Sequence, residues 1–163
     1  MNRLSSSALA VAAVLAAAPL SRADVAPAAP GDIIEVMSGQ FSAICGGVAG
    51  MRAFDGRLSG STYYPFVIPA DKVFVITAFD WRVQGPLVNR NRSAHAYRFV
   101  GGGYNAPAIV STALTDGGGV GGNSVTFPTG LVIQPGQQFC LRVDPVSAAD
   151  SVYGVLHGFL APR

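Results

Sequence analysis

The sequence predicts an all-β domain built as an antiparallel β-sandwich. Short apolar segments bounded by Gly, Pro and Asp recur along the chain, while no window of about 11–18 residues has the periodicity of an amphipathic helix. The chain also contains 20 Gly and 11 Pro, half of its residues are hydrophobic, and only 12% are charged. This composition favours short strands joined by tight turns, because a disordered chain needs high charge and few hydrophobic residues.

The first 23 residues have the layout of a secretory signal peptide. A basic start at Arg3 precedes an apolar run over residues 8–20, and Ser21 and Ala23 place small residues at the −3 and −1 positions of a cleavage site. The run is too short to be a membrane anchor. We therefore expect cleavage and export, to the periplasm, the cell surface or the medium.

Loss of this peptide changes the charge balance. The whole chain carries a net charge of +2, which comes from Arg3 and Arg22, and the remaining eight Arg and Lys72 balance nine acidic residues. A neutral mature chain lacks the field that attracts nucleic acid or an anionic membrane. No later apolar run reaches the roughly 18–20 residues of a transmembrane helix. We expect neither a nucleic-acid partner nor a transmembrane segment.

An extended linker, residues 24–31, and a single domain, residues 32–163, are expected after the signal peptide. The linker contains Pro27 and Pro30 among small residues, which disfavour helix and bury little surface. The domain has the length of one ordinary folding unit. Its expected strands are residues 33–37, 41–45, 51–57, 63–68, 72–83, 95–100, 108–113, 124–127, 138–143 and 152–160.

The longest expected strand, residues 72–83, is apolar on both faces at its start and on one face at its end. Under strict alternation, one face carries Val73, Val75, Thr77, Phe79, Trp81 and Val83. The other face begins with Phe74 and Ile76 and becomes polar from Asp80 onward. This pattern predicts a central strand that runs out to the edge of a sheet.

A weak internal similarity favours a jelly-roll order over an immunoglobulin-like one. Residues 67–75 and 132–140 each combine an apolar pair, a turn containing Pro and a following strand. Pro135-Gly136 fits the centre of a type II turn. Two such corners suit a sandwich made of two similar halves. Coincidence is the alternative, because many β-sandwiches contain this unit.

Cys45 and Cys140 are expected to form a disulfide, because an even cysteine count in an exported chain favours pairing. The bond would close a loop of about 95 residues, worth about 4–5 kcal/mol in the chain-entropy model. Phe139 and Leu141 are expected to face inward, which places Cys140 on an outer or rim face. Two unpaired thiols are the alternative, and a metal role is disfavoured because neither Cys has a ligand at suitable spacing.

No catalytic signature is present in the sequence. It contains no nucleophile elbow, phosphate loop or paired-histidine helix. His157 alternates with aromatic residues, which favours a core or interface position, and His95 is expected to be exposed. A metal site of His95, His157, Asp80 and Asp144 stays open as an alternative that the spacing does not demand. We expect no cofactor and no metal.

Surface loops are expected to carry the contact residues. The Gly-rich segments 101–105 and 116–123 resemble phosphate cradles in composition only, since no helix follows them, and are expected to be mobile loop tips. The polar segment 88–95 has two interpretations. It is either a basic patch that binds an anionic ligand or a loop that only contacts solvent. The candidate ligand-binding residues are Trp81, Arg90, Arg92, Tyr104 and Asn105.

Three hypotheses for function follow. The first is a non-enzymatic exported module that binds a glycan or an envelope protein, or that assembles at the cell envelope. The second is a self-associating structural subunit, in which strand 152–160 is an edge that pairs with another copy. The third and least favoured is a small secreted hydrolase or metal-dependent enzyme, because two histidines and scattered carboxylates supply no visible triad or ligand set.

Overall fold

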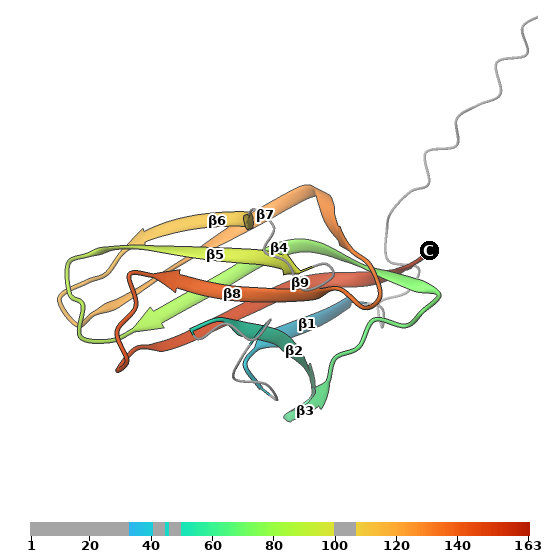
Figure 1. Cartoon of the computed structure of the whole chain (residues 1–163), viewed down its shortest axis with the longest axis horizontal. Helices are drawn as coiled ribbons and strands as arrows, with labels where there is room; N and C mark the ends of the chain where they lie inside the picture. The colour runs from blue at the N-terminus through green and yellow to red at the C-terminus, as the bar shows by residue number, and fades with distance from the viewer. Residues whose placement is uncertain (1–32, 41–44, 46–49, 100–106) are drawn as a thin grey trace, which may run out of the picture.

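The computed structural model describes residues 33–40, 45, 50–99 and 107–163, and within these ranges it contains nine strands and no helix (Figure 1). The strands are β1 (Ile33–Ser38), β2 (Arg52–Ser59), β3 (Thr62–Pro65), β4 (Lys72–Gln84), β5 (Asn91–Phe99), β6 (Pro107–Leu114), β7 (Val120–Ile133), β8 (Gln138–Asp144) and β9 (Ser151–Pro162). The expected all-β antiparallel fold is confirmed. The expected signal peptide and linker, and most of the expected strand 41–45, lie outside the described residues.

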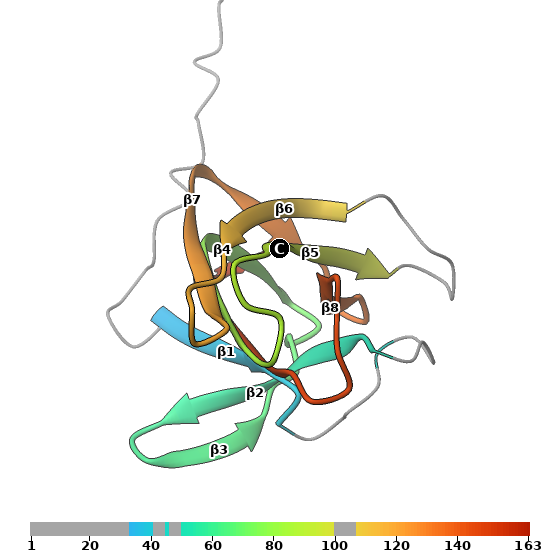
Figure 2. The ribbon, with the colours of Figure 1, turned by 90° about the vertical axis from the view of Figure 1, so that its left-hand side faces the viewer.

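The strands form one antiparallel sheet that curls into a nearly closed, barrel-like body. Their order is β6-β5-β8-β2-β1-β9-β4-β7, and β3 pairs with β2 beside this path. The two ends of the order approach each other, where the Asn123 side-chain amide donates to the Thr112 carbonyl at 3.2 Å. Figure 2 shows the strands around a central axis, with the β2–β3 hairpin projecting to one side.

Strand β9 is central, so the expectation that residues 152–160 form an edge is wrong. It pairs with β1 on one side and with β4 on the other. Two glycines on its inner face allow aromatic rings to pack directly on its backbone. A Cβ on Gly154 would lie 3.1 Å from the ring of Phe54, and one on Gly158 would lie 2.8 Å from the ring of Phe74.

A β-bulge at Thr77 divides β4 into two parts, and strict alternation along this strand is therefore a wrong expectation. The register with both neighbouring strands shifts between Ile76 and Ala78. Before the bulge, Phe74 and Ile76 face the main core, and after it the inward residues are Phe79, Trp81 and Val83. Val73 and Val75 instead pack with Phe159 and Ala161 in a separate small cluster. One extra residue reverses the faces of all that follow.

The disulfide between Cys45 and Cys140 is present. As predicted, Cys140 lies on the opposite face of β8 from the core residues Phe139 and Leu141. Both cysteines are nevertheless fully buried, because they belong to a second, smaller cluster. The other members of this cluster are Met51, Ala53, Phe99 and, at its edge, Tyr97. The bond therefore joins the segment before β2 to β8 in a covered layer outside the main core.

Two turns show how local sequence shapes the ends of the barrel. The Pro135-Gly136 turn is confirmed, since Gly136 has φ 77° and the Gln137 N–H donates to the Gln134 carbonyl at 3.2 Å. The Gly-rich segment 116–123 is not a loop tip over its whole length. Asp116 Oδ1 accepts the N–H groups of residues 118 and 120, and β7 begins at residue 120.

Candidate functional site

Two cavities open at opposite ends of β8 and differ in chemistry. The first, which we call the apolar cavity, has a volume of about 210 Å³ and lies at the start of β8. Its lining residues are Val36, Ala53, Phe54, Asp55, Phe66, Val67, Ile68, Phe74, Ile133, Gly136, Gln137, Gln138, Phe139 and Leu156. The two corner segments that resemble each other in sequence, before β4 and before β8, meet at this cavity.

Four phenylalanines build the wall of the apolar cavity. Phe54 lies 5.9 Å from Phe139, and Phe66 lies 5.2 Å from Phe74 in an edge-to-face contact, both measured between ring centroids. Such pairs hold their rings in fixed relative orientations. Because the inner glycines of β9 leave room for Phe54 and Phe74, the shape of the cavity depends on the packing of β9 beneath them.

Polar residues also line the apolar cavity. The Asp55 carboxylate accepts the N–H of Gln40 at 3.0 Å, and the Asp55 carbonyl accepts the N–H of Phe66 at 2.8 Å. This second bond ties the segment before β4 to β2. Gln137, in the turn before β8, and Gln138, the first residue of β8, line the cavity as well. An apolar pocket with a few convergent polar groups is the usual form of a small-molecule site.

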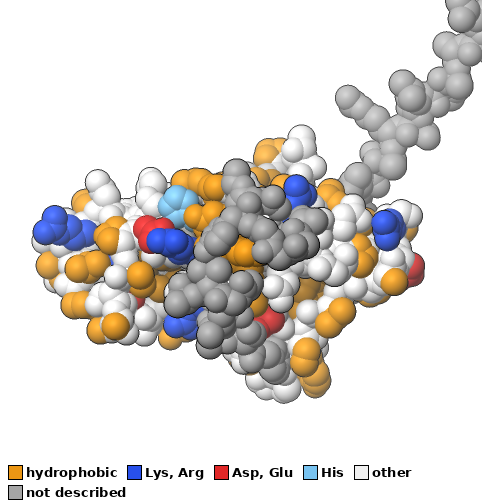
Figure 3. Space-filling model, viewed as in Figure 1, with side chains coloured by type: hydrophobic (Ala, Val, Ile, Leu, Met, Phe, Trp, Pro, Cys, Tyr) orange, Lys and Arg blue, Asp and Glu red, His pale blue; other side chains and the backbone are white. Residues whose placement is uncertain are grey.

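The mouth of the apolar cavity is flanked by exposed hydrophobic side chains. Val67 lines the cavity and is 78% exposed. On the adjoining strand β3, Tyr64 is 54% exposed and Tyr63 is also exposed. Figure 3 shows hydrophobic side chains over β3 at the lower edge of this face. A ligand that enters the cavity therefore passes a surface that is itself apolar.

The second cavity, which we call the polar-end cavity, has a volume of about 240 Å³ and lies beyond the end of β8. Its lining residues are Gly50, Arg52, Leu141, Val143, Val146, Ser147, Ala148, Asp150 and Val152. The walls from β8 and β9 are aliphatic. The charged residues in the lining are Arg52, from β2, and Asp150, from the β8–β9 loop.

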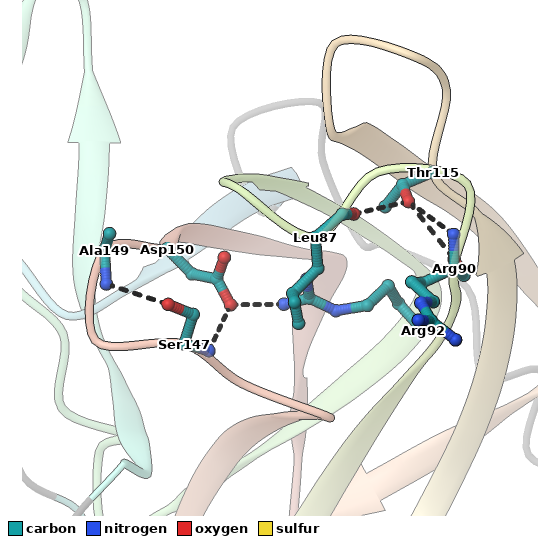
Figure 4. A network of polar contacts seen from close by, with 7 residues as sticks. All are labelled: Leu87, Arg90, Arg92, Thr115, Ser147, Ala149 and Asp150. Atoms are coloured by element: carbon teal, nitrogen blue, oxygen red, sulfur yellow. Dashed lines mark hydrogen bonds and ion pairs between the residues drawn. The ribbon is translucent and has the colours of Figure 1, made fainter.

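A buried ion pair closes the barrel interior beside the polar-end cavity (Figure 4). Arg92 Nη2 and Asp150 Oδ2 are in contact, and both side chains have no solvent exposure. The same carboxylate oxygen accepts the N–H of Ser147 at 2.6 Å. Among the described residues, Arg92 Nε and Nη1 and Asp150 Oδ1 have no hydrogen-bond partner. The pair anchors the β8–β9 loop to β5.

Of the candidate binding residues that the structure describes, Trp81 and Arg92 are buried and only Arg90 is exposed. Trp81 is buried and its indole N–H donates to Ser111 Oγ at 3.0 Å, so its expected place on a surface loop is wrong. Arg92 is also buried rather than on a loop. Arg90 is exposed, and its N–H donates to Thr115 Oγ1 at 3.0 Å (Figure 4). The other two candidates, Tyr104 and Asn105, lie outside the described residues.

A sequence signal for the position of Arg92 exists in the strand that follows it. Arg92, Ala94 and Ala96 alternate with Ser93, His95 and Tyr97, and this alternation begins two residues after Arg90. In the structure β5 begins at Asn91, and these three residues face inward and are fully buried. Small alanines on an inner face leave volume that one long side chain fills. Residues 88–95 are mostly polar, which favours a loop when this segment is considered alone.

His157, which was expected in the core or at an interface, lies outside the core, on the outer face of β9 between two carboxylates. Its Nε2 atom lies 2.7 Å from Asp80 Oδ2 and its Nδ1 atom lies 3.4 Å from Glu35 Oε1, with 31% of the side chain exposed. The carboxylates meet opposite ring nitrogens and so do not converge with the imidazole on one point. His95 is half-buried and stacks on Tyr97, with 6.1 Å between ring centroids. Among the described residues, no group of three or more such side chains is arranged to hold a metal ion.

Comparison with protein-family models, with curated proteins and with solved structures gives no match for this chain. In the part of the chain that the structure describes, no helix has the length and apolar character needed to cross a membrane. The two cavities are therefore the features of the molecule that bear on its function.

Proposed function

We propose that the protein is an exported, non-enzymatic binding module whose ligand is a small apolar molecule held in the apolar cavity. The cavity walled by four phenylalanines is the observation that carries this proposal. Export is supported by the sequence of residues 1–23 and by the disulfide, which persists in oxidising compartments.

Cavity size and lining indicate the class of ligand. An apolar cavity of roughly 150 Å³ accommodates benzene, so the 210 Å³ cavity has room for a substituted single ring. Asp55 and the two glutamines in its lining favour a ligand with one hydrogen-bond donor. A monocyclic phenol meets both requirements. A glycan or an envelope protein would instead contact the exposed tyrosines of β3.

Titration of the protein with p-cresol tests this function. Saturable shifts of backbone amide NMR signals are expected for residues 66–68 and 136–139, with weaker binding of toluene, which lacks the hydroxyl donor. Val36→Phe should fill the cavity and abolish the shifts. Val110→Phe, on the exposed outer face of β6, is the matched control and should leave them unchanged.

The function is contradicted if p-cresol produces no saturable shift up to its solubility limit, or if Val36→Phe binds as the unaltered protein does. Ile68→Phe, at the half-buried rim of the cavity, is a second filling variant in case Val36→Phe does not fold. The two variants fill the cavity from different segments, β1 and the connection between β3 and β4, so one of them suffices for the test.

We also infer that the fold is a jelly roll. Its support is the pairing of β5 with β6, β4 with β7, β2 with β8 and β1 with β9, which is the pattern of one long hairpin that turns between β5 and β6. Rolling such a hairpin would produce two four-stranded layers, β1-β9-β4-β7 and β2-β8-β5-β6. An experimental structure with two such layers about 10 Å apart would support this inference, and a round, evenly closed sheet would contradict it.

Self-association is a second candidate, favoured by β3. Among the described strands β3 pairs only with β2, and all four of its side chains are exposed. An exposed edge that carries aromatic residues is a surface on which another strand can pair. Light scattering should then report a dimer that Tyr64→Lys dissociates. A monomer at high protein concentration would exclude this candidate.

A further inference from the structure

We propose that the polar-end cavity is a second binding site, for a small organic monoanion whose carboxylate pairs with Arg52 and whose aliphatic body lies against β8 and β9. This site is separate from the apolar cavity and does not depend on its function. Three observations carry the proposal: the charge balance of the lining, the position of Arg52 and the aliphatic walls.

The charge balance of the lining favours an anion. Asp150 is neutralised by Arg92, since their side chains form an ion pair with no solvent exposure. Arg52 makes no hydrogen bond or ion pair with another described residue. Among the described residues that line the cavity, one positive charge is therefore left unbalanced, and guanidinium groups bind carboxylates in a bidentate geometry.

The Arg52 side chain passes beside the backbone of Gly39. A Cβ on Gly39 would lie 3.3 Å from both Cδ and Nη1 of Arg52, so the arginine side chain lies along the glycine. Gly39 has φ 69°, which side-chain-bearing residues adopt rarely, and its N–H donates to the Ala53 carbonyl at 2.7 Å. Gly39 therefore leaves room for the Arg52 side chain beside the cavity.

The walls of the cavity fit an aliphatic body. Leu141, Val143 and Val152 are buried core residues from β8 and β9, and Val146 adds a further aliphatic side chain from the loop. Since roughly 150 Å³ suffices for benzene, a volume of 240 Å³ accommodates a chain of about six carbons. Aliphatic walls with one cation at the side suit a short-chain fatty acid better than phosphate or sulfate.

The buried ion pair shapes this cavity. Asp150 Oδ2 joins Arg92 to the N–H of Ser147, which fixes the loop that forms the outer wall. A buried ion pair is weak evidence for stability, since an apolar replacement of similar volume is often as stable. Two roles explain why this ion pair lies beside the cavity. It keeps the β8–β9 loop open around a ligand, and its Arg92 neutralises the charge of Asp150.

Calorimetric titration with three six-carbon probes tests the proposal. Hexanoate should bind about tenfold more tightly than hexanol, and hexylamine should not bind, because only the carboxylate pairs with Arg52. Arg52→Gln should remove the difference between hexanoate and hexanol, while Arg52→Lys should keep part of it. Arg82→Gln, an exposed arginine on the outer face of β4, is the matched control and should bind hexanoate normally.

The retained binding of hexanol to Arg52→Gln shows that the cavity of this variant is intact. Equal affinity for hexanoate and hexanol in the unaltered protein, or an equal loss in Arg52→Gln and Arg82→Gln, overturns the proposal, as does the absence of hexanoate binding at millimolar concentration. Hexanoate should not displace p-cresol, because the two ligands bind in different cavities. Failure of the hexanoate test is therefore distinguishable from failure of the p-cresol test.

Discussion

Arg92 on β5 and Asp150 on the β8–β9 loop form an ion pair in which both side chains have no solvent exposure. The two residues are separated by 58 positions in the sequence, and their contact ties a loop to the barrel interior. Removal of one partner leaves an uncompensated buried charge, which is far more costly than loss of an exposed pair.

Asp150→Ala should therefore lower the free energy of unfolding by about 3–5 kcal/mol. Asp144→Ala, which breaks the partly exposed pair with Arg142, should lower it by no more than about 1 kcal/mol. Urea unfolding followed by tryptophan fluorescence measures both. Equal effects of the two variants would show that burial of the Arg92 pair has no energetic consequence.

Gly85→Ala should also destabilise the protein, because a Cβ at this position would overlap the Asp150 carboxylate. We expect a loss of about 1–3 kcal/mol. Gly117→Ala is the matched control, since nothing lies within 4 Å of the Cβ position there. The double variant Gly85→Ala with Asp150→Ala should lose less unfolding free energy than the two single variants lose together, because the overlap disappears with the carboxylate. Additive losses would contradict the overlap.

Deletion of Thr77 should prevent folding to the native state. Without the bulge, either the residues before it or those after it would turn to the wrong face of β4. Thr77→Val keeps the extra residue and loses only an exposed hydrogen bond to the His157 carbonyl, so it should cost about 1 kcal/mol or less. Circular dichroism and thermal unfolding distinguish these outcomes. A deletion variant with native stability would show that the strand tolerates either register.

Cys140→Ala should lower the free energy of unfolding by about 2–5 kcal/mol, because the disulfide closes a loop between residues 95 positions apart. Dithiothreitol should lower the stability of the unaltered protein by a similar amount. It should have no effect on the variant with both Cys45→Ala and Cys140→Ala. Sensitivity of that double variant to the reductant would mean that the loss arises from another cause.

Most strands could be predicted from local patterns, because alternation and turn residues act over a few positions. The Pro135-Gly136 turn and the facing of Cys140 are examples, and both are confirmed. The largest departure is β7, which spans 14 residues where four were expected. Its glycines and Pro128 indicate turns when read locally, but pairing with β4 holds them in a strand.

The candidate site was predicted poorly because cavities are formed by residues far apart in the chain. Arg92 was placed on a surface loop, although its alternation with Ala94 and Ala96 indicated an inner face. No local pattern marks Arg52 or Asp55 as cavity residues, since each depends on segments more than ten positions away. The phenylalanines of the apolar cavity were expected only as core residues, since the sequence does not reveal where a core leaves space.

By itself the sequence determined an all-β antiparallel fold with a disulfide, since turn chemistry, alternation and cysteine count are local or compositional properties. Tertiary structure alone decided that β9 is central, that a bulge at Thr77 reverses the faces of β4, and that Arg92 meets Asp150 inside the barrel. The physical reason is that strand pairing and the burial of a charge depend on contacts between distant segments, which form together and leave little trace in any single stretch of the chain.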